Sequence, residues 1–334
     1  MDETVFIEAL TKQVLANGEI SRDQAESLVL VGESNLPLLL DGARRIREHY
    51  LGNRASCCSI VAAKVGSCSE DCAFCSQSSH YNTHVAESRK LDHEAVYSAA
   101  DNAAANGAAC FGIVNSGYGP ENEEIAYWGP LIRRVRQAGR LRVCASLGVV
   151  SEEQARRLAA WGVQRYNLNL QTSRRFFGNI ITTHTYDDRL ASLRHLKAAG
   201  ISLCSGGLFG MGETWSDRLN LAFELRSLGV DVIPINLLIP IAGTPLGDQR
   251  QLDVNDGFKI IALFRFLFPR KDVKVAGGRE LCLGDRQNDI FAAGASSFLI
   301  GNYLTTCGRD PQEDLHMVRS QDLVMDTYSE VPDS

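Results

Sequence analysis

The stretch "HEAVYSAADNAAANGAACFGIVNSG", residues 93–117, contains the repeating unit that decides the fold. Residues 93–107 have the apolar spacing of an amphipathic helix and end at Gly107, a residue type that often terminates helices. Residues 109–117 form a short apolar run that is typical of a buried strand. We therefore interpret this stretch as a helix that leads directly into a strand.

The same alternation continues along most of the chain. Further strands are expected at 57–63, 142–150, 165–171, 202–210, 232–240, 273–278 and 296–304, and further helices at 151–162, 187–200, 216–229 and 256–268. Eight strands that alternate with helices indicate parallel βαβ units, and hence a doubly wound sheet or a (β/α)8 barrel. A chain of 334 residues is long enough for such a barrel.

The remaining segments flank this repeat. Residues 1–50 have helical patterns, including "SRDQAESLVLVG", which begins with a Ser suited to an N-cap. No Pro/Ser-rich linker interrupts the chain. We expect an N-terminal helical extension (1–50), a barrel (51–310) and a polar C-terminal tail (311–334).

Composition narrows the class of protein. The net charge of −6 gives no electrostatic sign of nucleic-acid binding. The apolar runs are shorter than a membrane helix requires, and the acidic start "MDETVFIEALTKQ" differs from a secretory signal. We expect a cytoplasmic protein without a membrane segment. In that compartment, ten cysteines suggest metal or redox chemistry rather than disulfides.

Three of these cysteines form the run "CSEDCAFC", residues 68–75. A structural zinc site needs four ligands, and no second CxxC hook accompanies Cys68, Cys72 and Cys75; a zinc site would need a distant fourth ligand. The alternative is a [4Fe–4S] cluster in which one iron is not bound by protein and stays open to a chelating molecule.

The pattern CxxxCxxC, with aromatic Phe74 just before the last cysteine, resembles the signature of radical S-adenosylmethionine enzymes. The resemblance implies that the three thiolates hold a [4Fe–4S] cluster and that the methionine moiety of S-adenosylmethionine chelates the fourth iron. One electron from the cluster then generates a 5′-deoxyadenosyl radical.

Within that superfamily the chain resembles biotin synthases over residues 50 to 310. The similar segments are "GSCSEDCAFCSQSS", "YNLNLQTS", "FFGNIITTHTYDDRL", "LCSGGLFGMGET", "IPINLLIPIAGTPL" and "AGGRE", in the family's order. The resemblance implies a radical sulfurtransferase of biotin biosynthesis that inserts sulfur into dethiobiotin, with an auxiliary iron–sulfur cluster as the sulfur source. It also implies a flavodoxin or ferredoxin as electron donor and a homodimer.

A second cysteine set is suited to that auxiliary cluster. Cys110, Cys144 and Cys204 each fall in an expected strand, and they can meet only inside a closed barrel. The alternative is three packed core cysteines. The resemblance matches the three to the family's auxiliary-cluster ligands, and Arg279 in "AGGRE" to its arginine ligand of a [2Fe–2S] centre.

Cys282 departs from the family pattern. We hypothesise that it replaces or supplements Arg279, because a thiolate is a better iron ligand than a guanidinium, and that the auxiliary cluster is then a larger [4Fe–5S] or [4Fe–4S] type. A passive loop cysteine is the equal alternative. Cys57, Cys58 and Cys307 match no ligand position, and we interpret them as core or loop thiols.

Polar residues complete the expected site. The amides Asn169 and Asn236 lie in otherwise apolar strands, where an unpaired amide is costly, although a satisfied structural amide is an alternative. The resemblance places Asn169, Gln171 and Arg189 near S-adenosylmethionine, and it places Asn169, Asn236, Thr305 and Thr306 near the substrate. Gln171 stands where the family commonly has Asp or Asn, and Leu168 where it has a histidine.

Two other functions stay open at this point. One is another enzyme of the same radical subfamily, of the hydrogenase-maturase or mutase type. The other is a non-catalytic iron–sulfur carrier, although such a protein needs no enclosed substrate pocket.

Overall fold

A closed barrel of parallel strands forms the centre of the molecule, as the alternating pattern predicts. The computed structural model describes residues 2–83, 85 and 89–328. Within these residues the barrel has eight positions, one of which is shared by the short strands β6 and β7. The strands are β1 (Arg54–Val65), β3 (Cys110–Asn115), β4 (Arg142–Ser146), β5 (Arg165–Asn167), β6 (Ser202–Cys204), β7 (Gly207–Phe209), β8 (Val232–Leu237), β9 (Asp272–Val275) and β10 (Ser297–Leu299). Pairing of β10 with β1, at Ser56 opposite Ser297 and Cys58 opposite Leu299, closes the barrel and excludes a doubly wound open sheet.

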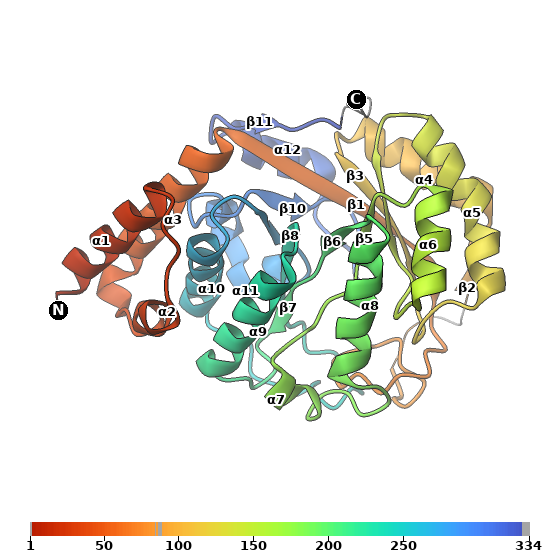
Figure 1. The fold of residues 1–334 in the computed structure, drawn as a ribbon, viewed down its shortest axis with the longest axis horizontal. Coiled ribbons are helices and arrows are strands. Elements are labelled where there is room, and N and C mark those ends of the chain that lie inside the picture. Colours follow the sequence, from red (N-terminus) through yellow and green to blue (C-terminus); the bar gives the residue numbers. More distant parts are fainter. Residues whose placement is uncertain (1, 84, 86–88, 329–334) are drawn as a thin grey trace.

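Helices surround this barrel, and each returns the chain from one parallel strand to the next (Figure 1). The outer helices are α4 (His93–Ala105), α5 (Asn122–Gln137), α6 (Glu152–Trp161), α8 (Tyr186–Ala198), α9 (Trp215–Leu228) and α10 (Val254–Leu267). Local sequence explains where several begin: α6, α8 and α9 each start with a capping box, at Ser151, Thr185 and Thr214.

The remaining elements lie in the connections and at both ends of the chain. They are α1 (Glu3–Leu15), α2 (Arg22–Val29), η1 (Glu33–Asn35), α3 (Leu36–Leu51), β2 (Arg89–Lys90), α7 (Arg174–Phe177), α11 (Arg279–Leu283), η2 (Gly284–Ile290), α12 (Pro311–Arg319) and β11 (Val324–Met325). Helices α1 to α3 extend from one side of the barrel, where α3 packs against α10 (Figure 1). After α12 the chain returns to β1, with Val324 paired to Arg54. The division into extension, barrel and tail stays a prediction, although the tail is tied to the barrel by this pairing.

Three local features differ from the sequence patterns. The run 202–210 is divided into β6 and β7 at Ser205 and Gly206. Glycine is required at position 206, because a Cβ there would lie 1.9 Å from the carbonyl oxygen of Pro234. The run 165–171 leaves the strand after Asn167, and Gln171 has a left-handed φ of 70°. The patterns did not single out α5, which contains Pro130, a residue type disfavoured inside helices.

No helix among residues 2–83, 85 and 89–328 is long and apolar enough to cross a lipid bilayer.

Candidate active site

A cavity of about 330 Å³ occupies the barrel interior. At one end it is bordered by Phe74 and Cys75, from the loop that follows β1. Deeper in the barrel it is bordered by four further cysteines, which are Cys58, Cys110, Cys144 and Cys204. The cavity therefore reaches one member of the three-cysteine run and all three residues of the second set.

The loop of residues 66–83 holds Cys68, Cys72 and Cys75. A turn inside the loop brings the last two together, since the Cys75 amide donates to the carbonyl oxygen of Cys72 (2.9 Å). The pKa of the Cys72 thiol is raised to about 12, chiefly by burial; Arg189 opposes this rise, and the nearby Cys75 and Cys68 contribute to it. Asp71 fastens the loop to the segment before α8, because its carboxylate accepts from the backbone amides of Thr182 (2.9 Å) and Thr183 (3.2 Å).

A buried polar chain connects this loop with the barrel wall. Glu70 contacts Nδ1 of His184, and Nε2 of His184 accepts a hydrogen bond from Nε of Arg189 (2.9 Å). Nη1 of Arg189 donates to the carbonyl oxygen of Asn169 (2.6 Å). Arg189 is thus buried rather than exposed on the surface of α8. Burial lowers the pKa of Arg189, while the nearby Cys72 and Glu70 act in the opposite direction.

Polar side chains follow one another along β5 and the segment after it. Arg165, Asn167, Asn169 and Gln171 all border the cavity. Arg165 and Asn167 do so because alternate residues of a strand face the same side. The Asn169 side chain accepts from the amide of Gly206 (3.2 Å). Leu168 points away from the cavity into the main hydrophobic core.

The expected substrate residues also border the cavity. Asn236 accepts from the amide of Gly277 (3.2 Å) and donates to the carbonyl oxygen of Gly207 (3.1 Å). Thr305 and Thr306 lie in the loop after β10, and the hydroxyl of Thr305 is 3.1 Å from that of Ser76.

The second cysteine set meets inside the barrel and includes a member that sequence reasoning missed. Cys58 lies directly opposite Cys110 on the adjacent strand, and the two are joined as a disulfide with their Cα atoms 4.8 Å apart. The interpretation of Cys58 as a core or loop thiol is therefore wrong, because strand pairing places the two sulfurs within bonding distance. Cys144 and Cys204 are buried free thiols on β4 and β6. Burial raises the pKa of Cys144, and the cations Arg165, Lys274 and Arg142 oppose this rise.

Lys274 is the cation that contacts these sulfurs. Its ammonium lies 3.4 Å from the sulfur of Cys204 and 3.8 Å from that of Cys58, and the residue is buried. The sequence contained a signal for it, since a lysine between two valines in "VKV" must direct its charge toward a polar interior.

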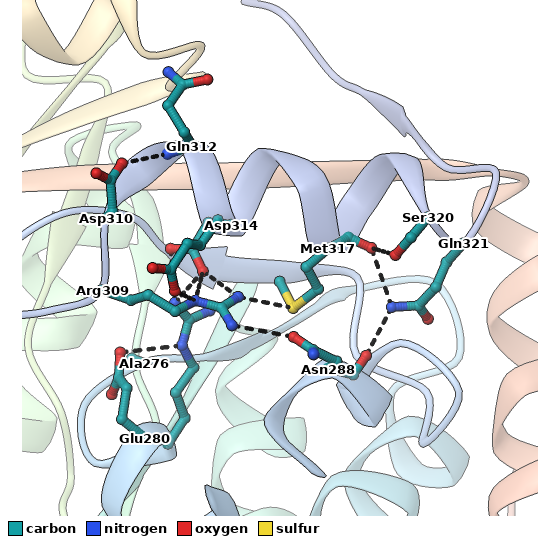
Figure 2. Close-up of polar contacts among 12 residues, drawn as sticks. Ala276, Glu280, Asn288, Arg309, Asp310, Gln312, Asp314, Met317, Ser320 and Gln321 are labelled. Atoms are coloured by element: carbon teal, nitrogen blue, oxygen red, sulfur yellow. Dashed lines mark hydrogen bonds and ion pairs between the residues drawn. The ribbon is translucent and has the colours of Figure 1, made fainter. Parts of the chain in front are cut away.

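Arg279 does not face the cysteines, contrary to the expectation from "AGGRE". Its Nη2 donates to both carboxylate oxygens of Asp314, at 2.6 and 2.7 Å. Figure 2 shows Asp314 projecting from α12 into this network, where Arg309 also binds it (2.7 Å). The guanidinium lies 5.4 Å from the ring centroid of Phe298, whose strand neighbour Leu299 borders the cavity. Because neighbouring strand residues face opposite sides, Arg279 lies outside the barrel.

Cys282 is also outside the barrel. Its thiol donates to the carbonyl oxygen of Leu252 (3.5 Å), in the segment before α10, and it packs in the main hydrophobic core. Burial, with the acids Asp253 and Asp256, raises its pKa to about 11. The geometry therefore supports the alternative reading of Cys282 as a passive buried thiol.

Thiolates are the usual ligands of iron–sulfur clusters. Among the described residues, no group of three or more His, Cys, Asp or Glu side chains is arranged to hold one metal ion. The thiolates of a four-iron cluster each bind a different iron, so they need not converge on one point. The buried Nε of Arg165 has no hydrogen-bond partner and lies beside the cysteines, which suits an anionic cluster.

Comparisons with known proteins agree with this geometry. Residues 65–225 match the radical SAM superfamily, and residues 234–324 match the biotin and thiamin synthesis associated domain. Among solved structures, methylornithine synthase has a TM-score of 0.84 at 18% identity, covering 95% of this chain and 97% of that one. The [FeFe]-hydrogenase maturase HydG has a TM-score of 0.82 at 20% identity, covering 96% and 76%. At such identities these structures show the fold alone, which is that of a radical SAM barrel.

Sequence relatives define the family. The chain is 45% identical to biotin synthase of Heliobacterium modesticaldum over 306 residues, which is 92% of this chain and 94% of the relative. It is 43% identical to biotin synthase of Carboxydothermus hydrogenoformans over 315 residues, covering 94% and 97%. The chain belongs to the biotin synthase family.

Proposed function

We propose that this chain converts dethiobiotin to biotin by radical insertion of sulfur inside its barrel. The observation that carries the proposal is the cavity of about 330 Å³ that touches both Cys75 and the deeper cysteines. A substrate held there lies between the expected radical source and the expected sulfur source. This volume is within the range of small-molecule sites.

Cys68, Cys72 and Cys75 would hold the [4Fe–4S] cluster at the open end. With S-adenosylmethionine bound, this cluster supplies a 5′-deoxyadenosyl radical that removes hydrogen atoms from unactivated carbons. The chain's own contribution is positioning. Asp71 fixes the cysteine loop, and Arg189 fixes the backbone at Asn169, so that loop and barrel wall keep one relative placement.

The amides would orient dethiobiotin. A ureido group needs both a donor and an acceptor, and an amide side chain offers both. After its contacts with Gly277 and Gly207, Asn236 retains one N–H and one lone pair that can face the cavity. The hydroxyls of Thr305 and Thr306 suit the polar end of the substrate.

Cys110, Cys144 and Cys204 would hold the auxiliary cluster, whose contribution when bound is the sulfur atom. Their place along the same cavity supports this role. Lys274, rather than Arg279, is the cation in contact with the set.

Three further expectations follow from the family resemblance. We propose that a flavodoxin or ferredoxin supplies the electron, that the protein is a homodimer, and that it acts in the cytoplasm. Sedimentation equilibrium tests the second of these directly.

The central experiment is anaerobic reconstitution with iron and isotopically labelled sulfide, followed by turnover with S-adenosylmethionine and a reductant. We expect 5′-deoxyadenosine formation to increase when dethiobiotin is added, and biotin to carry the labelled sulfur. Cys144→Ser should abolish biotin formation, whereas the matched control Cys282→Ser should retain it. If dethiobiotin causes no increase, the proposed function is wrong.

A further inference from the structure

We propose that Cys58 is the fourth cysteine ligand of the auxiliary cluster, beside Cys110, Cys144 and Cys204, and that Lys274 is the cation that balances this site. The inference rests on the proposed function and extends it, because it assigns a ligand that neither the family motifs nor the cysteine spacing indicated.

Strand geometry separates Cys58 from its neighbour Cys57. Adjacent strand residues face opposite sides. The thiol of Cys57 donates to the carbonyl oxygen of Gly107 (3.5 Å), and it is close enough to Asp314 and Arg279 to interact with both charges. Cys57 therefore faces outward toward α12, while Cys58 borders the cavity.

The sulfurs of the set are near one another. Cys58 and Cys110 are bonded to each other, and one ammonium, that of Lys274, contacts the sulfurs of both Cys58 and Cys204. Cys144 lies opposite Arg165 of β5, Cys204 lies opposite Asn167 of the same strand, and both cysteines border the same cavity. Four thiolates are the usual ligand set of an iron–sulfur cluster, with Cys58 in place of the arginine of the family pattern. The disulfide must be reduced to two thiols before iron can bind, which dithiothreitol accomplishes while it is itself oxidised.

Electrostatics favours this position over Cys282. Bound thiolates bring negative charge into the barrel, and Lys274 lies against the sulfurs while Arg165 offers a buried Nε without a partner. At Cys282 the nearby charges are instead the acids Asp253 and Asp256, which oppose a thiolate. The site that is electrostatically prepared for an anionic cluster is therefore the one that contains Cys58.

The test uses the full-length chain with Cys68→Ala, Cys72→Ala and Cys75→Ala, so that all bound iron belongs to the auxiliary site. This parent is reconstituted anaerobically with dithiothreitol, iron and sulfide, then desalted. Iron and sulfide are quantified, and Mössbauer spectra are recorded. We expect Cys58→Ala to reduce iron retention by at least about tenfold, since even the loss of a residue that only supports a ligand often costs that much.

Cys58→Ser keeps the size of the side chain and guards against misfolding; we expect it to shift the Mössbauer signal of one iron. Cys57→Ala, on the other face of the same strand, is the matched control and should behave as the parent. If both Cys58 variants have the same iron content and the same spectra as the parent, the inference is overturned, while the proposed auxiliary cluster stands. A parent that binds no cluster would overturn the auxiliary cluster itself.

Discussion

Replacement of Arg279 by methionine distinguishes a structural role from a metal-binding one. In the structure, Arg279 and Asp314 form a pair in which both side chains are almost fully buried, with two short hydrogen bonds of 2.6 and 2.7 Å. Removing the guanidinium leaves the Asp314 carboxylate buried, with Arg309 as its remaining ion-pair partner among the described residues (Figure 2). We therefore expect loss of stability without any change at the cysteines.

The expected loss of stability follows from the burial of the Arg279–Asp314 ion pair. Breaking a buried ion pair by removing one partner costs about 3–5 kcal/mol. For 334 residues, an unfolding entropy of about 2.1 cal/mol/K per residue gives about 0.7 kcal/mol/K in total. The melting temperature should therefore fall by about 4–7 °C.

The assay is differential scanning calorimetry, combined with Mössbauer spectroscopy of the reconstituted protein. Arg309→Met is the matched control, because Arg309 binds the same carboxylate but leaves Asp314 its two hydrogen bonds from Arg279, and we expect a smaller loss than for Arg279→Met. A double variant, Arg279→Met with Asp314→Leu, should recover part of the stability, because no carboxylate is then left buried.

Two results would refute this reasoning. If Arg279→Met melts within about 1 °C of the wild type, the buried pair does not hold α12 as its geometry indicates. If instead the cluster spectrum changes while the fold is stable, Arg279 acts on the metal site, as the family motif had suggested.

Two further predictions concern the scaffold. Burial alone would raise the pKa of Asp217, but hydrogen bonds from Arg175 (3.0 Å) and Ser173 (2.6 Å) outweigh it and hold the pKa below its usual range. Wild type should therefore be more stable than Asp217→Asn by about 1–3 kcal/mol at neutral pH, and this difference should shrink as pH falls below about 4. Urea unfolding measures the difference, and a difference that does not vary with pH would contradict this prediction. Gly206→Ala should cost about 3 kcal/mol or more, because the new Cβ meets the backbone of β8 at 1.9 Å, whereas Gly178→Ala, with nothing within 4 Å, should melt as wild type does.

The regular alternation of helix and strand periods predicts parallel βαβ units, and closure by β10 with β1 decides between a doubly wound sheet and a barrel. The first cluster could be predicted because its three expected ligands are close together in the chain. The second site is different. Its residues come from separate strands, so only closure of the barrel brings them together. The sequence suggested Cys110, Cys144 and Cys204 through the resemblance, but it gave no reason to choose Cys58 over Cys57.

Sequence patterns cannot decide between Cys57 and Cys58 for a physical reason. A barrel strand is buried on both faces, so an apolar run such as "CCSIVAA" does not show which residues face the interior. A charged residue in a strand shows which of its residues face the interior. In "VKV" the lysine must face the polar interior, and the same alternation then places Ala276 inside, as the cavity lining shows.

The same alternation explains why the motif "AGGRE" was misleading. Motif similarity aligns Arg279 with a ligand, but a helix rather than a strand begins at this residue, so the inward alternation of β9 no longer applies to it. Gly278, with φ of 84°, makes the turn, and a Cβ there would lie 1.9 Å from the carbonyl oxygen of Leu237. The chain therefore leaves the barrel wall before it reaches Arg279. Lys274 is the cation of β9 that faces the interior. We therefore look for the fourth ligand not after β9 but at Cys58 in β1, the strand that closes the barrel.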